Sequence, residues 1–257
     1  MSIATALRDV SATRYVTPLR EGGSLPGLVE ADDDGLYVAK FRGAGQGLRA
    51  LVAEVIVGEL ARRLELLVPE LVTVEIDPVL GAAEPDPEIQ ELIGASAGSN
   101  LGVDFLPGAL PYVPGGAWVP DARLAADVVW LDGLATNVDR TPRNPNLLLW
   151  HGRMWLIDHG AALYLHHAGL IPAEHAERAF PLISEHVLLP RAGSITDAHA
   201  RLAPRVTRQM LEEIVTLVPG GWFADAQSDP ETYVDYLVRR VGGGRFAEEA
   251  ERARTES

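Results

Sequence analysis

The chain has 257 residues, with 22 lysines and arginines against 36 aspartates and glutamates, so its formal net charge is −14. This length can bury a good core in one two-lobed domain or two small ones, and a composition of 47% hydrophobic and 23% charged residues is ordinary for a soluble globular protein. The negative charge argues against general nucleic-acid binding, and the absence of cysteine excludes disulfides, thiolate zinc sites and cysteine nucleophiles.

No segment predicts a membrane span or a secretory signal. The sequence holds no uncharged apolar run of about 18 residues. Its N-terminus lacks a basic region followed by an apolar core. We therefore expect a cytoplasmic protein, for which a cysteine-free composition is compatible with a reducing compartment; the sequence does not indicate an oligomeric state.

The first hundred residues favour a small β-rich unit with one helix. Leucine, valine and isoleucine recur at helical spacing over residues 48–64, and Pro69 disfavours continuation of this helix. Residues 32–35 predict a turn between strands, and residues 77–100, rich in proline, glycine and acidic residues, predict a variable connection. Strands are predicted at residues 14–19, 25–31, 36–41, 71–76 and 101–105.

The rest of the chain is predicted to be mainly helical. A hinge is expected at Pro107-Gly108, and a buried helix over residues 122–134 leads into a polar loop. The charged residues 247–257 are expected to fray. Further helical segments are predicted at residues 173–180, 198–218 and 231–241.

That polar loop and the hairpin after it are the most informative stretch. Asp139-Arg140 precede two apolar runs separated by residues 151–153, and Asn146 enters the first run while Asp158 follows the second. Hard oxygen ligands beside a third carboxylate suit Mg²⁺ on a phosphate chain better than a soft metal. The pattern predicts a phosphotransferase in which an Asn and an Asp hold the metal and Asp139 meets the substrate hydroxyl. Each residue type alone is common in turns, so the prediction depends on their joint arrangement.

Lys40 and Glu54 are predicted on the nucleotide side of the site. Strand alternation sends Val38 and Lys40 to one face, where a lysine can neutralise the inner phosphates of a nucleotide. Such a lysine needs a carboxylate to hold it, and Glu54 on the following helix is our choice, since Glu59 is turned away. The alternatives are a solvated lysine on an edge strand and an exposed helical glutamate.

Three residues of a predicted loop and Asp104 complete the candidates for nucleotide binding. Gly22, Gly23 and Ser24 lie between two predicted strands, where backbone N–H groups can approach phosphates. A plain hairpin turn explains this loop almost as well. Ser24 is also a candidate for self-phosphorylation. Asp104, next to the predicted hinge, is a further candidate nucleotide-binding residue.

Zinc chemistry and serine hydrolysis have little support. Four histidines, at 151, 159, 166 and 167, bracket the hairpin, but no His-Glu-x-x-His pattern occurs. No Gly-x-Ser-x-Gly elbow is present either.

The run from Asp139-Arg140 through Asn146 to Asp158-His159-Gly160 resembles the catalytic and metal-binding segments of HipA-type kinases. Val38-Ala39-Lys40 resembles the strand that carries the nucleotide lysine in these proteins, and the helix with Glu54 resembles the one that pairs with it.

The resemblance covers roughly residues 14–165 and implies an α+β, two-lobed protein-kinase-like fold. Residues 1–105 would form a small β-rich, nucleotide-binding N-lobe with one helix. Residues 106–257 would form a mainly helical C-lobe that carries the catalytic hairpin and the metal site.

The resemblance also implies ATP and Mg²⁺ as cofactors. Asp139 would accept the proton of the substrate hydroxyl, and Asn146 and Asp158 would ligate the metal. The family spacing selects Asn144, whereas strand context fixes the direction of the Asn146 side chain. We therefore prefer Asn146 and keep Asn144 as its rival.

The remaining roles follow from the same resemblance. Lys40, held by Glu54, would contact the inner phosphates, and Arg140 or Arg143 would stabilise charge on the transferred phosphoryl group.

The expected acceptor is a protein Ser or Thr. A small hydroxylated molecule, as in antibiotic- or lipid-kinase-like enzymes, is the alternative, and a nucleotide-binding pseudokinase that serves as an interaction module is another. The presence of Lys40, Asp139 and Asp158 speaks against a degraded site. No Ala-Pro-Glu motif follows, so a conventional activation segment is not expected, and no toxin role is inferred.

Overall fold

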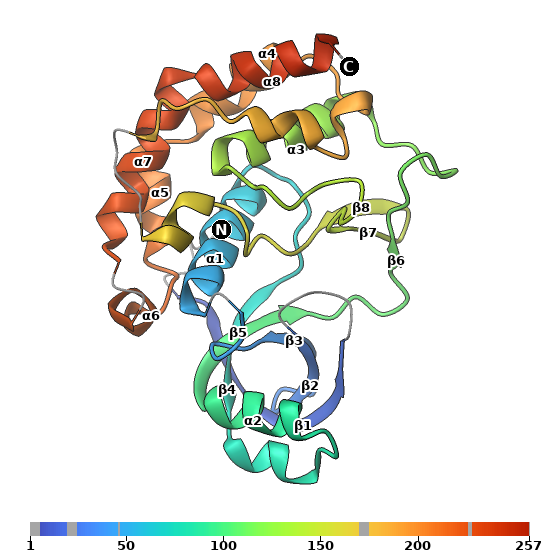
Figure 1. Ribbon diagram of the computed structural model, residues 1–257, viewed down its shortest axis with the longest axis vertical. Helices are drawn as coiled ribbons and strands as arrows, with labels where there is room; N and C mark the ends of the chain where they lie inside the picture. The colour runs from blue at the N-terminus through green and yellow to red at the C-terminus, as the bar shows by residue number, and fades with distance from the viewer. Residues whose placement is uncertain (1–5, 20–24, 46, 170–174, 226–227, 257) are drawn as a thin grey trace.

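A closed five-stranded β-barrel forms the β-rich part of the molecule (Figure 1). The computed structural model describes residues 6–19, 25–45, 47–169, 175–225 and 228–256. Around the barrel the strand order is β1-β2-β3-β5-β4, and β4 closes the barrel by pairing in parallel with β1. The strands are β1 (Arg8–Pro18), β2 (Gly27–Ala31), β3 (Leu36–Lys40), β4 (Leu71–Ile76) and β5 (Gly98–Asp104).

Alternation along β3 decides which side chains fill the barrel and which face away from it. Tyr37 and Ala39 are buried in the barrel core with valines from β1, β2 and β4. Val38 and Lys40 point the other way, and Val38 packs against the core of the helical part. The predicted common face of Val38 and Lys40 is therefore confirmed.

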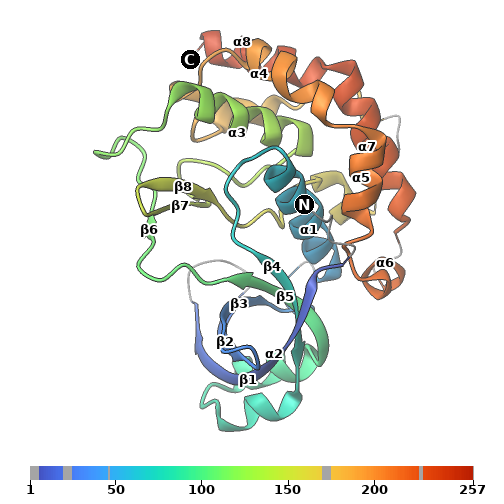
Figure 2. The same ribbon diagram turned by 180° about the vertical axis from the view of Figure 1, so that it is seen from behind.

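Residues 77–100 are more regular than we predicted. They hold the 3₁₀ helix η1 (Pro78–Ala83) and the helix α2 (Pro87–Ala95), which packs against the barrel at the end far from the helical part (Figure 2). Asp77 and Asp86 cap these helices, each followed by proline at the first helical position. Both are standard start signals, so the expected variable connection is corrected to two capped helices.

The helix α1 (Leu48–Arg63) follows β3 directly but packs into the core of the helical part. Both views place it between the barrel and α3 (Figures 1 and 2). The other α-helices are α3 (Ala122–Ala135), α4 (Ile195–Leu202), α5 (Arg208–Val215), α6 (Gly220–Asp225), α7 (Pro230–Gly243) and α8 (Arg245–Glu256). Short 3₁₀ helices are η2 (Tyr164–Ala168), η4 (Pro181–Glu185), η5 (Leu189–Arg191) and η6 (Ala203–Arg205).

Three predicted elements of the C-terminal half are corrected. The single helix expected over 198–218 is two helices, α4 and α5, separated by η6, in which Pro204 lacks the N–H that a continuous helix needs. The expected frayed end is the helix α8, anchored by buried Phe246 and Ala250. Of the helix expected over 173–180, residues 173 and 174 lie outside the described residues, and the described part is not α-helical. Within the ranges described, no helix is long and apolar enough to cross a bilayer.

The predicted hairpin is confirmed as β7 (Leu147–Trp150) and β8 (Arg153–Leu156), with β6 (Leu110–Pro111) pairing with β7. His151 and Gly152 form its turn with φ angles of 48° and 72°, the left-handed pair of a tight two-residue turn. At the open end, the N–H of Ile157 donates to the carbonyl of Asn146 at 3.1 Å. The two loops that flank the hairpin are thereby brought together.

A buried arginine joins α7 to α3 in the helical part. The Arg240 guanidinium, 2% exposed, donates to the carbonyls of Gly133, Ala176 and Arg178 at 2.9–3.2 Å and lies over the ring of Phe246. Burial lowers its pKa from the ordinary value. One fork of donors therefore satisfies three carbonyls, of which those of Gly133 and Ala176 are reached by buried hydrogen bonds.

We expect Arg240→Met to lower the free energy of unfolding by about 3 kcal/mol, because it leaves two buried carbonyls without these donors. The exposed neighbour Arg239 supplies the matched control, and Arg239→Met should change stability by less than about 0.5 kcal/mol. Urea unfolding followed by circular dichroism measures both. Equal stability of the two variants would remove the structural role of Arg240.

Candidate active site

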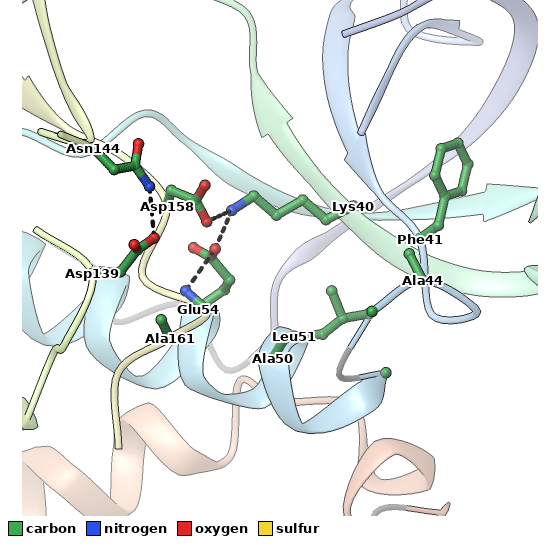
Figure 3. A pocket seen from close by; sticks show the side chains of 13 residues that line it. Lys40, Phe41, Ala44, Ala50, Leu51, Glu54, Asp139, Asn144, Asp158 and Ala161 are labelled. Atoms are coloured by element: carbon green, nitrogen blue, oxygen red, sulfur yellow. Dashed lines mark hydrogen bonds and ion pairs between the residues drawn. The ribbon is translucent and has the colours of Figure 1, made fainter. Parts of the chain in front are cut away.

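A cleft of about 310 Å³ lies where the barrel, α1 and the two loops flanking the hairpin meet (Figure 3). Its walls come from the end of β3, the segment that leads into α1, the first turns of α1, the loop after α3 and the loop after β8. The lining residues are Lys40, Phe41, Ala44, Gly45, Gly47, Ala50, Leu51, Glu54, Asp139, Asn144, Asp158, Gly160 and Ala161.

Lys40 and two carboxylates form the centre of the cleft. The Lys40 ammonium donates to Glu54 Oε1 and, at 2.8 Å, to Asp158 Oδ1 (Figure 3). The Glu54 side chain is only 3% exposed, whereas that of Asp158 is 43% exposed. The Lys40–Glu54 pair predicted from the sequence is therefore present in the structure, and Asp158 is the group that faces solvent.

Glu54 also fixes the loop that carries Asp158. Its two carboxylate oxygens accept from the backbone N–H groups of His159 at 2.9 Å and Gly160 at 2.8 Å. Asp158 itself has a φ of 57°, a left-handed conformation that costs energy for a residue with a Cβ. The two hydrogen bonds hold the chain in this conformation immediately after the strained residue.

Lys40 and Asp158 each stabilise the charged form of the other. Burial alone would lower the pKa of Lys40, but Glu54 and Asp158 outweigh burial and raise it above its ordinary value. Lys40 in turn lowers the pKa of Asp158 to about 2, against the effect of burial. At neutral pH the cleft thus presents an ammonium and an ionised carboxylate side by side.

Asp139 lies on the opposite wall with two asparagine amides on one of its oxygens. Asp139 Oδ2 accepts from Asn144 Nδ2 at 2.8 Å and from Asn146 Nδ2 at 3.1 Å. Asn144 is exposed and lines the cleft, whereas Asn146 is 9% exposed and does not. Asn146 also has a left-handed φ of 50° at the start of β7. The structure thus brings both metal candidates to Asp139 and only Asn144 to the cleft.

Arg140 does not reach the cleft. Its side chain is fully buried and its Nε donates to Asp132 Oδ2 at 2.5 Å. Its Nη1 donates to the carbonyls of Asn146 and Ile157, and its Nη2 lies 3.2 Å from His159 Nδ1. The guanidinium therefore bridges the two loops at the base of the hairpin from the inside.

Asp132, in the last turn of α3, anchors this arginine. Burial would raise the pKa of Asp132, but Arg140 and His186 outweigh it and hold that pKa well below its ordinary value. His186 Nε2 lies 2.8 Å from Asp132 Oδ2, and Asn137 Nδ2 donates to Asp132 Oδ1 at 3.0 Å. Sequence reasoning missed this residue, although a carboxylate within the apolar stretch 128–135 was a usable signal.

The other predicted residues lie elsewhere. Gly22, Gly23 and Ser24 lie outside the described residues. Asp104 pairs with Tyr37 in the β3–β5 ladder, while Lys40 pairs with Leu101, and Asp104 is not among the residues that line the cleft. Burial raises the pKa of Asp104.

A glycine-containing segment before α1 was missed. Gly43, Gly45 and Gly47 are spaced two residues apart in the sequence, and the last two line the cleft with φ angles of 50° and 63°. Three glycines in five residues directly before a helix is a pattern that permits backbone approach to an anion at the helix N-terminus.

Comparison with known proteins gives two findings. A family model described as HipA-like kinase matches residues 13–241. Among solved structures, the Helicobacter pylori proinflammatory kinase CtkA is similar, with a TM-score of 0.57 and 11% sequence identity over 100% of this chain and 99% of that one. At this identity the likeness shows a shared fold. No curated protein matches the sequence.

Because His159 is buried beside Asp158, we expect the free energy of unfolding to depend on pH. Burial and the charge of Arg140 lower the pKa of His159 to about 3. A histidine in the unfolded chain takes up its proton near pH 6.5, roughly. Below that pH the unfolded state binds a proton that the folded state does not accept. The contribution of His159 to the free energy of unfolding is therefore complete above about pH 6.5 and is lost as the pH falls toward the folded-state pKa. The loss is up to about 1.4 kcal/mol per pH unit.

We expect His159→Asn to remove this contribution, because an asparagine oxygen can still accept from Arg140 but does not titrate. The loss of unfolding free energy between about pH 6 and pH 5 should shrink by about 1.4 kcal/mol relative to the natural chain. Urea titrations at each pH measure it, with His151→Asn on the exposed hairpin turn as the control that keeps the natural slope. An unchanged slope in His159→Asn would show that His159 titrates normally.

Proposed function

The chain belongs to the HipA-like kinase family and is a kinase, and we propose that it transfers the γ-phosphoryl group of ATP, with Mg²⁺, to the hydroxyl of a protein Ser or Thr. The observation that supports this most is the meeting of Lys40, Asp158 and Asp139 in one cleft. In this proposal residues 1–105 act as a nucleotide-binding N-lobe and residues 106–257 as a catalytic C-lobe.

The phosphate chain of ATP would lie along Lys40 and the start of α1. Lys40 is charged and held by two carboxylates, so it can contact phosphate oxygens without losing its position. The N-terminus of α1 carries no acidic residue in its first turn and no capping side chain, so its positive dipole end is available to an anion. The glycines at 45 and 47 allow the backbone to approach.

Asp158 and Asn144 are the residues we assign to Mg²⁺. Their carboxylate and amide oxygens are hard donors that suit this ion, and both line the cleft. Within the described residues no three His, Cys, Asp or Glu side chains form a metal site, which fits an ion whose remaining ligands are phosphates and water. When bound, the ion would neutralise charge on the phosphates. Asn146, our first choice from the sequence, is better placed to orient Asp139.

Asp139 is the proposed catalytic base. Its carboxylate would accept the proton of the acceptor hydroxyl as the oxygen attacks phosphorus. The amides of Asn144 and Asn146 hold one carboxylate oxygen in place, which leaves the other for the acceptor. Arg140, which we had considered for the phosphoryl group, would act as a positioning residue, because it ties the Asp139 loop to the Asp158 loop from inside.

We expect ATP to bind more tightly with Mg²⁺ than without it, and Asp158→Asn to weaken the Mg²⁺-dependent part tenfold or more, about 1.4 kcal/mol. Titration calorimetry of the natural chain and the variant measures this. Asp34→Asn is the matched control, because Asp34 has the same left-handed backbone, with a φ of 61°, on the exposed β2–β3 turn. No binding of ATP to the natural chain in either condition would refute the proposed nucleotide chemistry.

Asp139→Asn should lower phosphoryl transfer by about 10²–10⁴-fold, since asparagine cannot accept the proton. ATP binding should stay close to that of the natural chain, which separates a catalytic defect from a folding defect. Transfer of label from γ-labelled ATP to protein acceptors measures turnover. Unchanged turnover would remove the role of Asp139, and ATP binding without transfer in the natural chain would favour a nucleotide-binding interaction module.

A further inference from the structure

A second hollow lies beside the same catalytic loop and is not part of the cleft. Asp139 and Asn144 line the cleft, whereas the three residues 141–143 between them line a groove of about 550 Å³. Its other wall comes from η4 and the residues after it. The residues that line the groove are Thr141, Pro142, Arg143, Ser184, Glu185, His186, Val187 and Pro190.

The far wall of the groove is fixed to the catalytic loop. The N–H of Val187 donates to the carbonyl of Arg140 at 3.0 Å, next to Asp139 in the chain. His186 lies 2.8 Å from Asp132, the carboxylate that anchors Arg140. A ligand in the groove would therefore be held at a defined position relative to Asp139.

The groove is open and not an enclosed pocket. Five of its eight lining residues are exposed: Pro142, Arg143, Ser184, Glu185 and Pro190. Small-molecule sites usually enclose most of their ligand within apolar walls. An open groove with prolines and polar side chains at its edges instead suits an extended segment of another protein.

Arg143 gives the groove its charge preference near the reaction centre. It is exposed, lies four positions after Asp139, and its side chain forms no ion pair or hydrogen bond with the part of the chain that the structure describes. It is a positive charge in a chain whose formal net charge is −14. The Arg143 guanidinium can therefore pair with a carboxylate of a ligand without first breaking a contact to the described residues. Glu185, also exposed, lies on the opposite wall.

We propose that this groove binds the phosphoryl acceptor, and that the acceptor is a peptide segment with an acidic side chain close to its Ser or Thr. The inference rests on the proposed kinase reaction. Arg143 pairs with the acidic side chain and places the hydroxyl at Asp139. The hydroxyl oxygen bonds to the γ-phosphorus while its proton passes to Asp139, and the bond from that phosphorus to the bridging oxygen breaks, releasing ADP.

The test is a panel of serine peptides that differ only in whether each position flanking the serine is Asp or Lys. Phosphorylation is measured as kcat/KM with γ-labelled ATP for the natural chain, Arg143→Glu and Arg143→Lys. We expect the natural chain to prefer acidic peptides by about tenfold at one or more flanking positions, Arg143→Lys to keep that preference in part, and Arg143→Glu to reverse it. Arg153→Glu, the same change at an exposed site on β8, is the control that keeps the natural preference.

Several outcomes would overturn the proposal. If Arg143→Glu lowers the use of acidic and basic peptides equally, or abolishes ATP binding in calorimetry, Arg143 acts on the nucleotide. If the natural chain hydrolyses ATP but phosphorylates no peptide, the groove does not take a peptide, while the kinase reaction stands. If the natural chain does not bind ATP at all, the failure is that of the proposed function itself.

Discussion

The buried carboxylate of Glu54 is the interaction on which the rest of the site depends. Removing a carboxylate from water costs several kcal/mol, roughly, unless charges and hydrogen bonds replace its hydration. Here an ammonium from the barrel and two backbone N–H groups from the loop after β8 supply the replacement. Because α1 is itself packed in the core of the helical part, Glu54 joins three segments that are otherwise separate in the sequence.

A second buried ion pair does the same for the other wall of the cleft. Arg140 is held by Asp132 and donates to carbonyls at both ends of the hairpin. The two pairs differ from their neighbours in exposure: Glu54 and Arg140 are enclosed, while Asp158 is partly exposed beside Lys40 and Asn144 is exposed beside Asp139. Reactive side chains on loops need such support, because loop backbone alone does not fix their positions.

The sequence predicted the elements whose signals are local. Alternation along residues 36–41 placed Lys40 on the face opposite the barrel core, and helical spacing then allowed the choice of Glu54. The two apolar runs around His151-Gly152 predicted the hairpin, and with it the approach of the loops that carry Asp139 and Asp158. These inferences needed only periodicity and turn chemistry.

What sequence patterns did not determine was the direction in which a charged side chain points once the chain is folded. Arg140 follows Asp139 directly, yet one side chain faces the interior and the other faces the cleft. The partner that draws Arg140 inward, Asp132, is on a helix whose charge pattern offered no reason to pair it with this particular arginine. Long-range pairs of this kind depend on tertiary packing, which local propensity does not encode.

The two asparagines after Asp139 are a second case in which the sequence did not determine where a side chain points, and the structure separates them. Strand context correctly predicted that Asn146 enters β7, and this same position buries the residue. Its carbonyl accepts from the N–H of Ile157 and from Arg140 at the base of the hairpin. Asn144, two residues earlier, stays on the exposed part of the loop and reaches the cleft. In this loop, entry into β7 thus buries Asn146 behind Asp139, whereas Asn144, outside the strand, keeps an exposed side chain that lines the cleft.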